Sequence, residues 1–457
     1  MFPKIKHAFS DKQLIKWLIT LSVPIALQSL INASINTADT VMVGQLGEDA
    51  IAAVGLANQV FFILMLMLYG VTSGCNIFAS QFWGKRDIPN LRRTVAISTM
   101  LSLIPSAIFT VCALTIPEPL MRIFSQDDAV VDMGIKYLQV IAYSYIPYSF
   151  TWAISSILRA VERTRLPLLM SLISLLLNVS LNYVLIFGNL GFPALGVEGA
   201  AIATLIARIV EFVVIIILLY TVYLSIAARI SDYRRSVEKK FLVPVLKLVS
   251  PVILNETIWG IGIAIYSIIF SHMGTGVVAA MSVARAFENL ANSLSQGIAF
   301  AVGVVVGKTI GEHKINLALD YGNRFAIITP TVNMFLSIII LCITPLWVGI
   351  YNLSDIVRAD TIILLIIVAV YLPIRNTNMV QMVGTLRNGG DTKIVLYLDF
   401  IGVWFIALPM GAIFGILLQQ PITIVYPLML LEEIMKFIVV HARVKRGAWA
   451  RNLVRDM

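Results

Sequence analysis

The sequence predicts an all-α polytopic membrane protein whose twelve transmembrane helices form two six-helix lobes related by an internal repeat. Of the 457 residues, 59% are hydrophobic and only 13% are charged, and the mean hydropathy is +0.89. This composition excludes a soluble domain of that size. Apolar runs of about 20 residues recur along the chain, and each is long enough to cross a bilayer. The first run, from Leu14 onward, lacks a small-residue cleavage site, so we expect a permanent helix.

A stretch of the chain repeats about half a chain later, with a constant shift of 227 residues. The repeated positions are Pro24, Gly47, Ala52, Ala53, Gly70 and Gly84, which recur as Pro251, Gly274, Ala279, Ala280, Gly297 and Gly311. Leu158-Arg159 and Thr164 recur as Leu386-Arg387 and Thr392, one residue out of step. Such repeats are typical of transporters built from two packed bundles. Two acids break the pattern, because Asp39 corresponds to Tyr266 and Glu256 corresponds to Ser29.

The distribution of basic residues predicts the topology. We expect spans to begin near residues 15, 51, 95, 133, 166 and 197, and again near 243, 277, 319, 359, 393 and 421. Lysine and arginine gather in alternate connections, which places both termini in the cytoplasm and requires an even number of spans. Six spans per half make the repeat parallel. We therefore predict a first lobe over 1–225, a cytoplasmic loop over 226–242 and a second lobe over 243–457.

The net charge of +9 follows from this topology, so we expect no nucleic-acid partner. The opposite connections are acidic or neutral, apart from Arg122, Lys136 and Arg358.

The first span carries one polar stripe. Its members lie at steps of four, four and three residues, namely Gln28, Asn32, Asn36 and Asp39. This spacing puts them on one helical face, which must point at protein or water. Asp39 matters most, because an ionisable side chain at membrane depth is expensive unless it is paired or protonated. It indicates a cation or proton site, and a structural acid bound to a neighbouring helix is the alternative.

The fifth and sixth spans offer partners for Asp39. Asn178 and Asn182 are four residues apart, as are Ala200 and Thr204. A carboxylate, two amide oxygens, a hydroxyl and a backbone carbonyl would form an oxygen cage suited to a small cation such as Na⁺. Polar contacts that only hold helices together are the alternative for each asparagine.

The seventh span carries a second acid, Glu256, shortly after Pro251. Trp259 follows on the next turn and Tyr266 lies further along. An acid beside aromatic rings can hold an organic cation by charge and by cation–π contact. The alternative is a structural ion pair between Glu256 and Arg375 in the tenth span.

Two further acid–base pairs lie within single spans. Arg208 and Glu211 are three residues apart, and so are Arg285 and Glu288. Residues at this spacing are neighbours on a helix surface, so we expect each pair to be structural.

The remaining reactive side chains give no catalytic pattern. The three cysteines lie in apolar segments at unrelated spacings and the four histidines are scattered, so neither a disulfide framework nor a metal motif is indicated. We expect no enzymatic activity and no cofactor.

The chain resembles the multidrug and toxic compound extrusion (MATE) family over essentially its whole length. The matching motifs are Asn36-Thr37-Ala38-Asp39-Thr40-Val41-Met42-Val43-Gly44, Leu46-Gly47, Ala50-Ile51-Ala52-Ala53-Val54-Gly55, Gln81-Phe82-Trp83-Gly84, Leu158-Arg159-Ala160 and Leu386-Arg387-Asn388-Gly389-Gly390-Asp391-Thr392. The resemblance implies a central cavity between two lobes, and export of cationic amphipathic compounds in exchange for Na⁺ or H⁺. It also implies a multi-pass protein of the bacterial inner membrane. We expect a monomer that needs no cofactor other than the coupling ion.

The resemblance carries over to individual residues. Asp39 matches the family's first-helix carboxylate, Asn178 and Asn182 match two fifth-helix positions, and Ala200 and Thr204 resemble the sixth-helix contribution. Some relatives carry Asp where this chain has Asn182, which leaves the choice between Na⁺ and H⁺ open.

In the second lobe, Glu256 matches the seventh-helix acid of the branch that couples ions there, and Asn376 stands where part of that branch has Asp. We expect a second-lobe acid and substrate site. Its residues would be Glu256, Asn36, Trp259, Tyr266 and Asn376.

A lipid-linked oligosaccharide or polymer flippase of the same superfamily is the nearest rival. It would need basic residues in its cavity to hold phosphate, and only Arg285 and Arg375 favour it.

Overall fold

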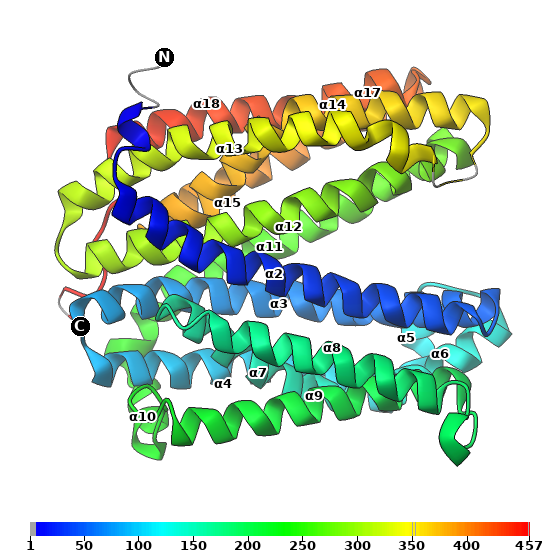
Figure 1. The fold of residues 1–457 in the computed structure, drawn as a ribbon, viewed down its shortest axis with the longest axis horizontal. Coiled ribbons are helices and arrows are strands. Elements are labelled where there is room, and N and C mark those ends of the chain that lie inside the picture. Colours follow the sequence, from blue (N-terminus) through cyan, green and yellow to red (C-terminus); the bar gives the residue numbers. More distant parts are fainter. Residues whose placement is uncertain (1–5, 350, 352, 456) are drawn as a thin grey trace. The chain divides into compact units, whose positions relative to one another are not determined.

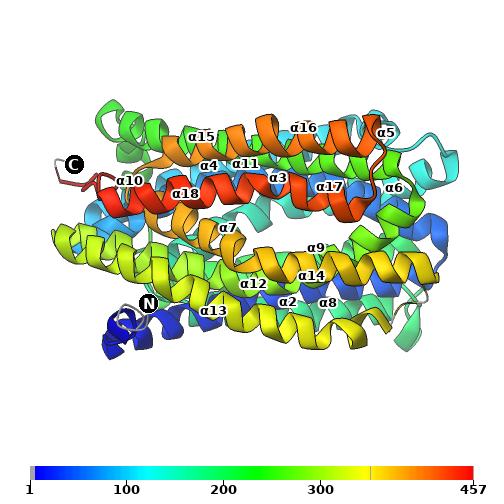
Figure 2. The same ribbon diagram turned by 90° about the horizontal axis from the view of Figure 1, so that it is seen from above.

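The computed structural model describes residues 6–349, 351, 353–455 and 457, and its regular secondary structure consists of helices (Figures 1 and 2). The chain divides into two compact units. One unit contains the described residues up to Ala26 and residues 254–455, and the other contains Leu27–Ile253 together with Met457. Two long helices, α2 (Lys12–Gly44) and α11 (Lys239–Met273), therefore contribute to both units.

The Leu27–Ile253 unit is built mainly from the first half of the chain. Its helices are α3 (Glu48–Lys85), α4 (Ile88–Thr115), α5 (Pro117–Arg122), α6 (Asp128–Ile141), η1 (Ala142–Ser144), α7 (Tyr145–Ala160), α8 (Arg165–Leu185), η2 (Asn189–Gly191), α9 (Gly196–Thr221) and α10 (Ile230–Ser236). Helix α3 packs against α4, α6 and α7, while α8 packs against α9 (Figure 1). Buried apolar side chains such as Leu64, Leu68 and Tyr145 form the core of this unit.

The other unit follows the same plan. Its helices are α12 (Thr275–Gly311), α13 (Ile315–Gly349), α14 (Asp355–Met379), η3 (Val380–Leu386), α15 (Thr392–Ile401), η4 (Gly402–Ala407), α16 (Leu408–Met410), η5 (Gly411–Leu417), α17 (Ile422–Met429) and α18 (Leu431–Arg446). Three of these segments, η3, η4 and η5, are π-helical. Helix α14 packs against α12, α13 and α18 (Figures 1 and 2).

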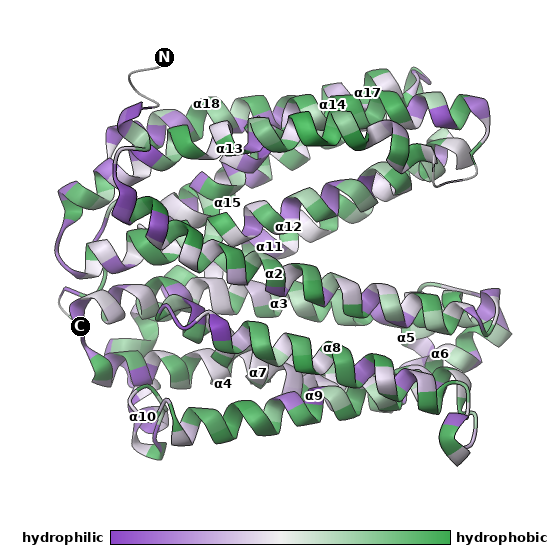
Figure 3. Cartoon of the chain, in the orientation of Figure 1, coloured by the Kyte–Doolittle hydropathy of each residue, from purple (hydrophilic) through white to green (hydrophobic). Residues whose placement is uncertain are grey.

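The predicted all-α fold with twelve spans is confirmed. Among the residues that the structure describes, ten helical segments are long and apolar enough to cross a membrane, and the ribbon in Figure 3, coloured by residue hydropathy, is hydrophobic along much of these helices and hydrophilic at many of the connections. The fourth and twelfth spans are each interrupted once. The fourth runs from α6 through η1 to α7, and the twelfth breaks between α17 and α18. Pro427, which lacks an amide N–H, precedes the second break.

The internal repeat is visible in the backbone. Gly47 caps α3 with φ 119°, and its counterpart Gly274 caps α12 with φ 121°. Residues that carry a side chain rarely adopt this backbone conformation, so both positions favour glycine. The same turn therefore starts the second span of each half.

A second pair of repeated glycines explains the division into units. A Cβ on Gly70 would lie 2.7 Å from Ile253 Cα on α11, and one on Gly297 would lie 2.7 Å from the carbonyl oxygen of Ser22 on α2. The units divide two residues after Pro24 and two residues after Pro251. The first part of each half's leading helix thus packs on the second span of the opposite half.

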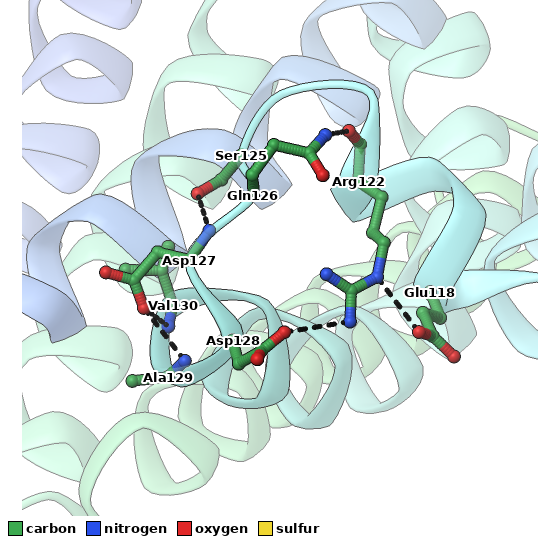
Figure 4. A network of polar contacts seen from close by, with 8 residues as sticks. All are labelled: Glu118, Arg122, Ser125, Gln126, Asp127, Asp128, Ala129 and Val130. Carbon is green, nitrogen blue, oxygen red and sulfur yellow. Dashed lines mark hydrogen bonds and ion pairs between the residues drawn. The ribbon is translucent and has the colours of Figure 1, made fainter.

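Arg122, at the end of α5, is one of the few basic residues in the connections that are predicted to be acidic or neutral. Arg122 donates to Glu118 Oε1 at 3.0 Å and to Asp128 Oδ1 at 3.0 Å (Figure 4). The hydrogen bond to Glu118, and next the hydrogen bond to Asp128, raise the pKa of the Arg122 guanidinium above its usual value. Arg122 is thus charge-compensated where the topology prediction allows few cations.

Candidate functional site

Three helices bring four of the predicted residues together. Asp39 projects from α2, Asn178 and Asn182 from α8, and Thr204 from α9. The amide nitrogen of Asn182 donates to Asp39 Oδ1 at 2.5 Å and to Asn178 Oδ1 at 3.3 Å. Asn178 Nδ2 donates in turn to Thr204 Oγ1 at 3.0 Å. A continuous hydrogen-bonded chain therefore links the carboxylate to the sixth span.

Close packing of α8 and α9 positions this series of hydrogen-bonded side chains. Gly199 lies near the start of α9, where a Cβ would be 2.5 Å from the carbonyl oxygen of Leu185 at the end of α8. Asn178 is 1% exposed, Asn182 0% and Thr204 6%. Ala200, which is 2% exposed, lies one turn before Thr204 on the same helix. The two amides are thus almost completely buried.

The donor set fits a small monovalent cation. It offers one carboxylate, two amide oxygens and one hydroxyl, and hard alkali cations prefer such oxygens. Asn182 Oδ1 is buried and has no hydrogen-bond partner among the described residues. Within the same part of the chain, no three His, Cys, Asp or Glu side chains gather around one point. The set therefore suits Na⁺ or a proton better than a transition metal.

Arg208 is a further charged residue near this site. It lies one turn after Thr204 on α9 and interacts electrostatically with Asp39. Its guanidinium carbon is 4.3 Å from the ring centroid of Phe61 and 4.6 Å from that of Tyr148. Nη1 donates to Ser144 Oγ at 2.9 Å. Because Arg208 follows Thr204 by four residues, helical periodicity alone places both side chains on the same face of α9.

The predicted pairing of Arg208 with Glu211 is not found. Among the described residues, no ion pair within 4 Å joins the two, because the guanidinium is held by Ser144 and by two aromatic rings.

The rest of the polar stripe on α2 separates into different environments. Gln28 is 6% exposed; it donates to Ser171 Oγ at 3.2 Å and accepts from Arg159 Nη1 at 3.1 Å. Asn36 is exposed. The stripe thus contains one helix-packing residue, Gln28, as well as the acid at its other end.

The structure pairs Glu256 with Arg387, so Arg375, the partner in the alternative interpretation of Glu256, is wrong. Glu256 Oε1 lies 2.9 Å from Arg387 Nη1. Arg375 instead pairs with Glu288, and its Nε is 3.8 Å from Glu433 Oε1. Arg387 follows the tenth span directly and reaches back to α11, which sequence spacing within one helix could not show.

The predicted pair of Arg285 with Glu288 is also replaced. Glu288 binds Arg375, while Arg285 donates to Ser267 Oγ at 3.1 Å and lies over the ring of Phe270.

The other second-lobe residues do not gather around Glu256. Tyr266 donates its hydroxyl to Glu432 Oε1 at 3.2 Å. Asn376 donates to Ser295 Oγ at 2.7 Å and to Asn333 Oδ1 at 2.8 Å. Trp259 is partly buried and packs against the apolar core of its unit. Tyr266 and Asn376 therefore belong to separate polar clusters.

The contact of Glu256 has a counterpart in the first half. Arg159 binds Gln28 there, and Arg387 binds Glu256 here. Both arginines are buried, at 4% and 2% exposure. The one-residue offset between Arg159 and Arg387 equates Gln28 with Glu256, whereas the uniform shift had equated Glu256 with Ser29.

Comparisons with known proteins find similarity in both halves of the chain. The MatE family model matches residues 24–184 and 251–413, one segment in each half. The uncharacterized transporter YisQ of Bacillus subtilis is 23% identical over 440 residues, which is 95% of both chains. The probable multidrug resistance protein NorM of Thermotoga maritima is 27% identical over 410 residues, covering 87% of this chain and 84% of that protein.

Solved structures show the same fold. A crystal structure of MATE in the bent conformation has a TM-score of 0.84 at 22% identity, covering 95% of this chain and 96% of that one. A MOP superfamily transporter from Pyrococcus furiosus has a TM-score of 0.85 at 22% identity, covering 94% and 95%. The chain therefore belongs to the MatE family of multidrug and toxic compound extrusion transporters.

Proposed function

We propose that the protein exports cationic amphipathic compounds in exchange for Na⁺ or H⁺, by alternating access of its two lobes. The observation that carries this proposal is the Asp39 site, a membrane-depth carboxylate connected through Asn182 and Asn178 to Thr204. An ionisable side chain at such depth is usually functional. Relatives described as probable multidrug resistance proteins support the drug-efflux part.

The hydrogen-bonded chain supports an exchangeable ion. An amide offers either its NH₂ group or its oxygen, depending on how it is turned. With the NH₂ group toward Asp39, Asn182 satisfies the bare carboxylate. Turned the other way, its oxygen would join Asp39, Asn178 and Thr204 around a cation. A bound Na⁺ would supply the positive charge that neutralises Asp39 in the membrane.

Coupling requires that the ion and the drug bind the two conformations of the transporter with different affinity. We infer that neutralising Asp39, by Na⁺ or by a proton, shifts the balance between the two conformations. The protein would act in the bacterial inner membrane as a monomer, with its termini in the cytoplasm and without a cofactor.

The rival function, a lipid-linked flippase, is less well supported. The most buried cations of the second half are already neutralised, because Arg387 pairs with Glu256 and Lys436 lies between Asp399 and Glu432. They offer little uncompensated positive charge to a phosphate group.

Transport in proteoliposomes tests the proposal. A fluorescent cationic amphipathic dye should move against its gradient when either a Na⁺ or an H⁺ gradient is imposed separately. Asp39→Asn, which is nearly isosteric, should abolish this movement. Asp132→Asn, an exposed acid in the same half, is the matched control and should transport normally. Full gradient-driven movement by Asp39→Asn at normal expression would show that Asp39 is structural.

A further inference from the structure

The unit that contains most of the second half holds a buried group of two carboxylates around one ammonium. Lys436 Nζ on α18 lies 3.0 Å from Asp399 Oδ1 on α15 and 2.9 Å from Glu432 Oε2, one turn earlier on α18. The side chains of Lys436, Glu432 and Asp399 are 4%, 9% and 16% exposed. We call these three residues the lysine triad.

The lysine triad has an excess negative charge. Glu256 nearby is balanced by Arg387. Arg375 also has two acids, Glu288 and Glu433, but its side chain is 27% exposed and Asn378 donates to Glu433 Oε2 at 2.8 Å. The triad differs because its base, Lys436, is only 4% exposed. An uncompensated charge in a low-dielectric interior is strongly unfavourable, so the triad needs one more positive charge.

A proton can supply this charge and a metal ion cannot. The ammonium of Lys436 already occupies the position between the two carboxylates that a metal cation would take. No group of three potential metal-ligating side chains occurs among the described residues. A proton needs no cavity, because it forms an O–H bond with one carboxylate.

The surroundings of the triad are built to hold either protonation state. Tyr266 donates to Glu432 Oε1 at 3.2 Å, and Asn255 Nδ2 donates to Asp399 Oδ2 at 3.1 Å. Asn255 is 4% exposed, yet its Oδ1 has no hydrogen-bond partner among the described residues. This oxygen is an acceptor next to Asp399 that can receive a hydrogen bond from a protonated carboxyl group or a water molecule.

The backbone also makes room for the triad. Gly402 begins the π-helical segment η4, and a Cβ there would lie 2.6 Å from Lys436 Cε and 2.8 Å from Glu432 Oε2. Helix α18 packs directly on η4. A second π segment, η3, ends immediately before Arg387. Such segments are rare and often mark functional sites.

Beyond the triad itself, the charged and titratable groups nearby lie on the helices that pack on α18 or bond to it, and on α12, which pairs with α14. They are Glu256 and Tyr266 of α11, Arg285 and Glu288 of α12, Arg375 of α14, Arg387 after η3, Tyr426 of α17 and Glu433 of α18. On α13, Asp320 and Arg324 pair with each other. None of these groups supplies the missing positive charge.

We propose that Asp399, Glu432 and Lys436 form a proton-binding site in which the two carboxylates share one exchangeable proton. On uptake, a proton from water bonds to one oxygen of either acid, and the ammonium pairs with the other acid. On release the proton returns to water, and Lys436 again bridges both. Asp399 is the most exposed member and provides the route. The site is separate from Asp39 and rests on the proposed function only for its use in transport.

Proton counting on the full-length protein in nanodiscs tests this site without any drug or Na⁺. All variants carry Asp39→Asn, so the first-half site contributes nothing. The protons released between about pH 5 and about pH 8 are measured by back-titration. Glu432→Gln and Asp399→Asn should each release one proton fewer per molecule than the parent. Lys436→Met, which leaves both acids uncompensated, should release one more.

Glu433→Gln is the matched control, because Arg375 keeps Glu288 as its partner, and its proton count should equal the parent's. Unchanged counts in folded Glu432→Gln and Asp399→Asn would make the triad a fixed salt bridge and overturn the proposal. If neither variant folds, infrared difference spectra of the parent decide. A protonated carboxyl band must appear in the parent on acidification and must be larger in Lys436→Met, and its absence in the parent overturns the proposal.

Discussion

Replacing Glu256 tests whether its carboxylate neutralises Arg387, as the structure shows. Arg387 is 2% exposed and its Nη1 lies 2.9 Å from Glu256 Oε1. Removing one partner of a buried ion pair typically costs about 3–5 kcal/mol, because the other charge stays buried and unpaired. We therefore expect Glu256→Leu to lose stability in this range. Glu256→Gln should lose less, because it keeps an acceptor for a charged donor, a bond worth about 1.5–3 kcal/mol.

Thermal unfolding of purified protein in detergent measures these changes, and a double-mutant cycle identifies the partner. Combining Glu256→Leu with Arg387→Met removes both charges and should recover part of the lost stability. The matched control combines Glu256→Leu with Arg375→Met, and its losses should simply add. The cycle distinguishes Arg387 from Arg375 as the partner of Glu256, because the coupling energy between residues in contact is about 0.5–3 kcal/mol. Equal recovery with either arginine, or recovery only with Arg375→Met, would refute the assigned pair.

Three further substitutions test the packing. Gly70→Ala and Gly297→Ala should each destabilise the protein in detergent by about 1–3 kcal/mol, since the added methyl group would overlap α11 or α2. Gly55→Ala is the control, because a Cβ there meets nothing within 4 Å, and equal melting temperatures for all three would contradict the close approach. Trp449→Ala should cost about 3–5 kcal/mol, because the indole is fully buried against Gly322; an unchanged melting temperature would show that the C-terminal segment is dispensable.

The helices and the first-half site followed from the sequence for clear physical reasons. Apolar runs of spanning length predict membrane helices because the bilayer fixes their length. Asn178 and Asn182, four residues apart, had to share one face of α8, and the structure brings that face to Asp39. The role of these residues in ion coupling stays a prediction.

The polar contacts of the second half could not be predicted from spacing. Residues on one helix are related by its periodicity, but the choice between Arg375 and Arg387 for Glu256 depends on how separate helices pack. The lysine triad was missed for the same reason, since Asp399 lies more than 30 residues before Glu432. The burial of Trp449 was also hidden, because it lies in a basic segment after the last span.

The coupling ion is the central claim, and calorimetry of Na⁺ binding at several pH values tests it most directly. Asp39 with the neutral partners Asn178, Asn182 and Thr204 provides one negative charge, so Na⁺ and a proton should compete for the same carboxylate. We predict that Na⁺ affinity weakens as the pH falls and that Asp39→Asn abolishes the binding heat. Affinity that is indifferent to pH, or a binding heat that persists in Asp39→Asn, would contradict a shared site at Asp39.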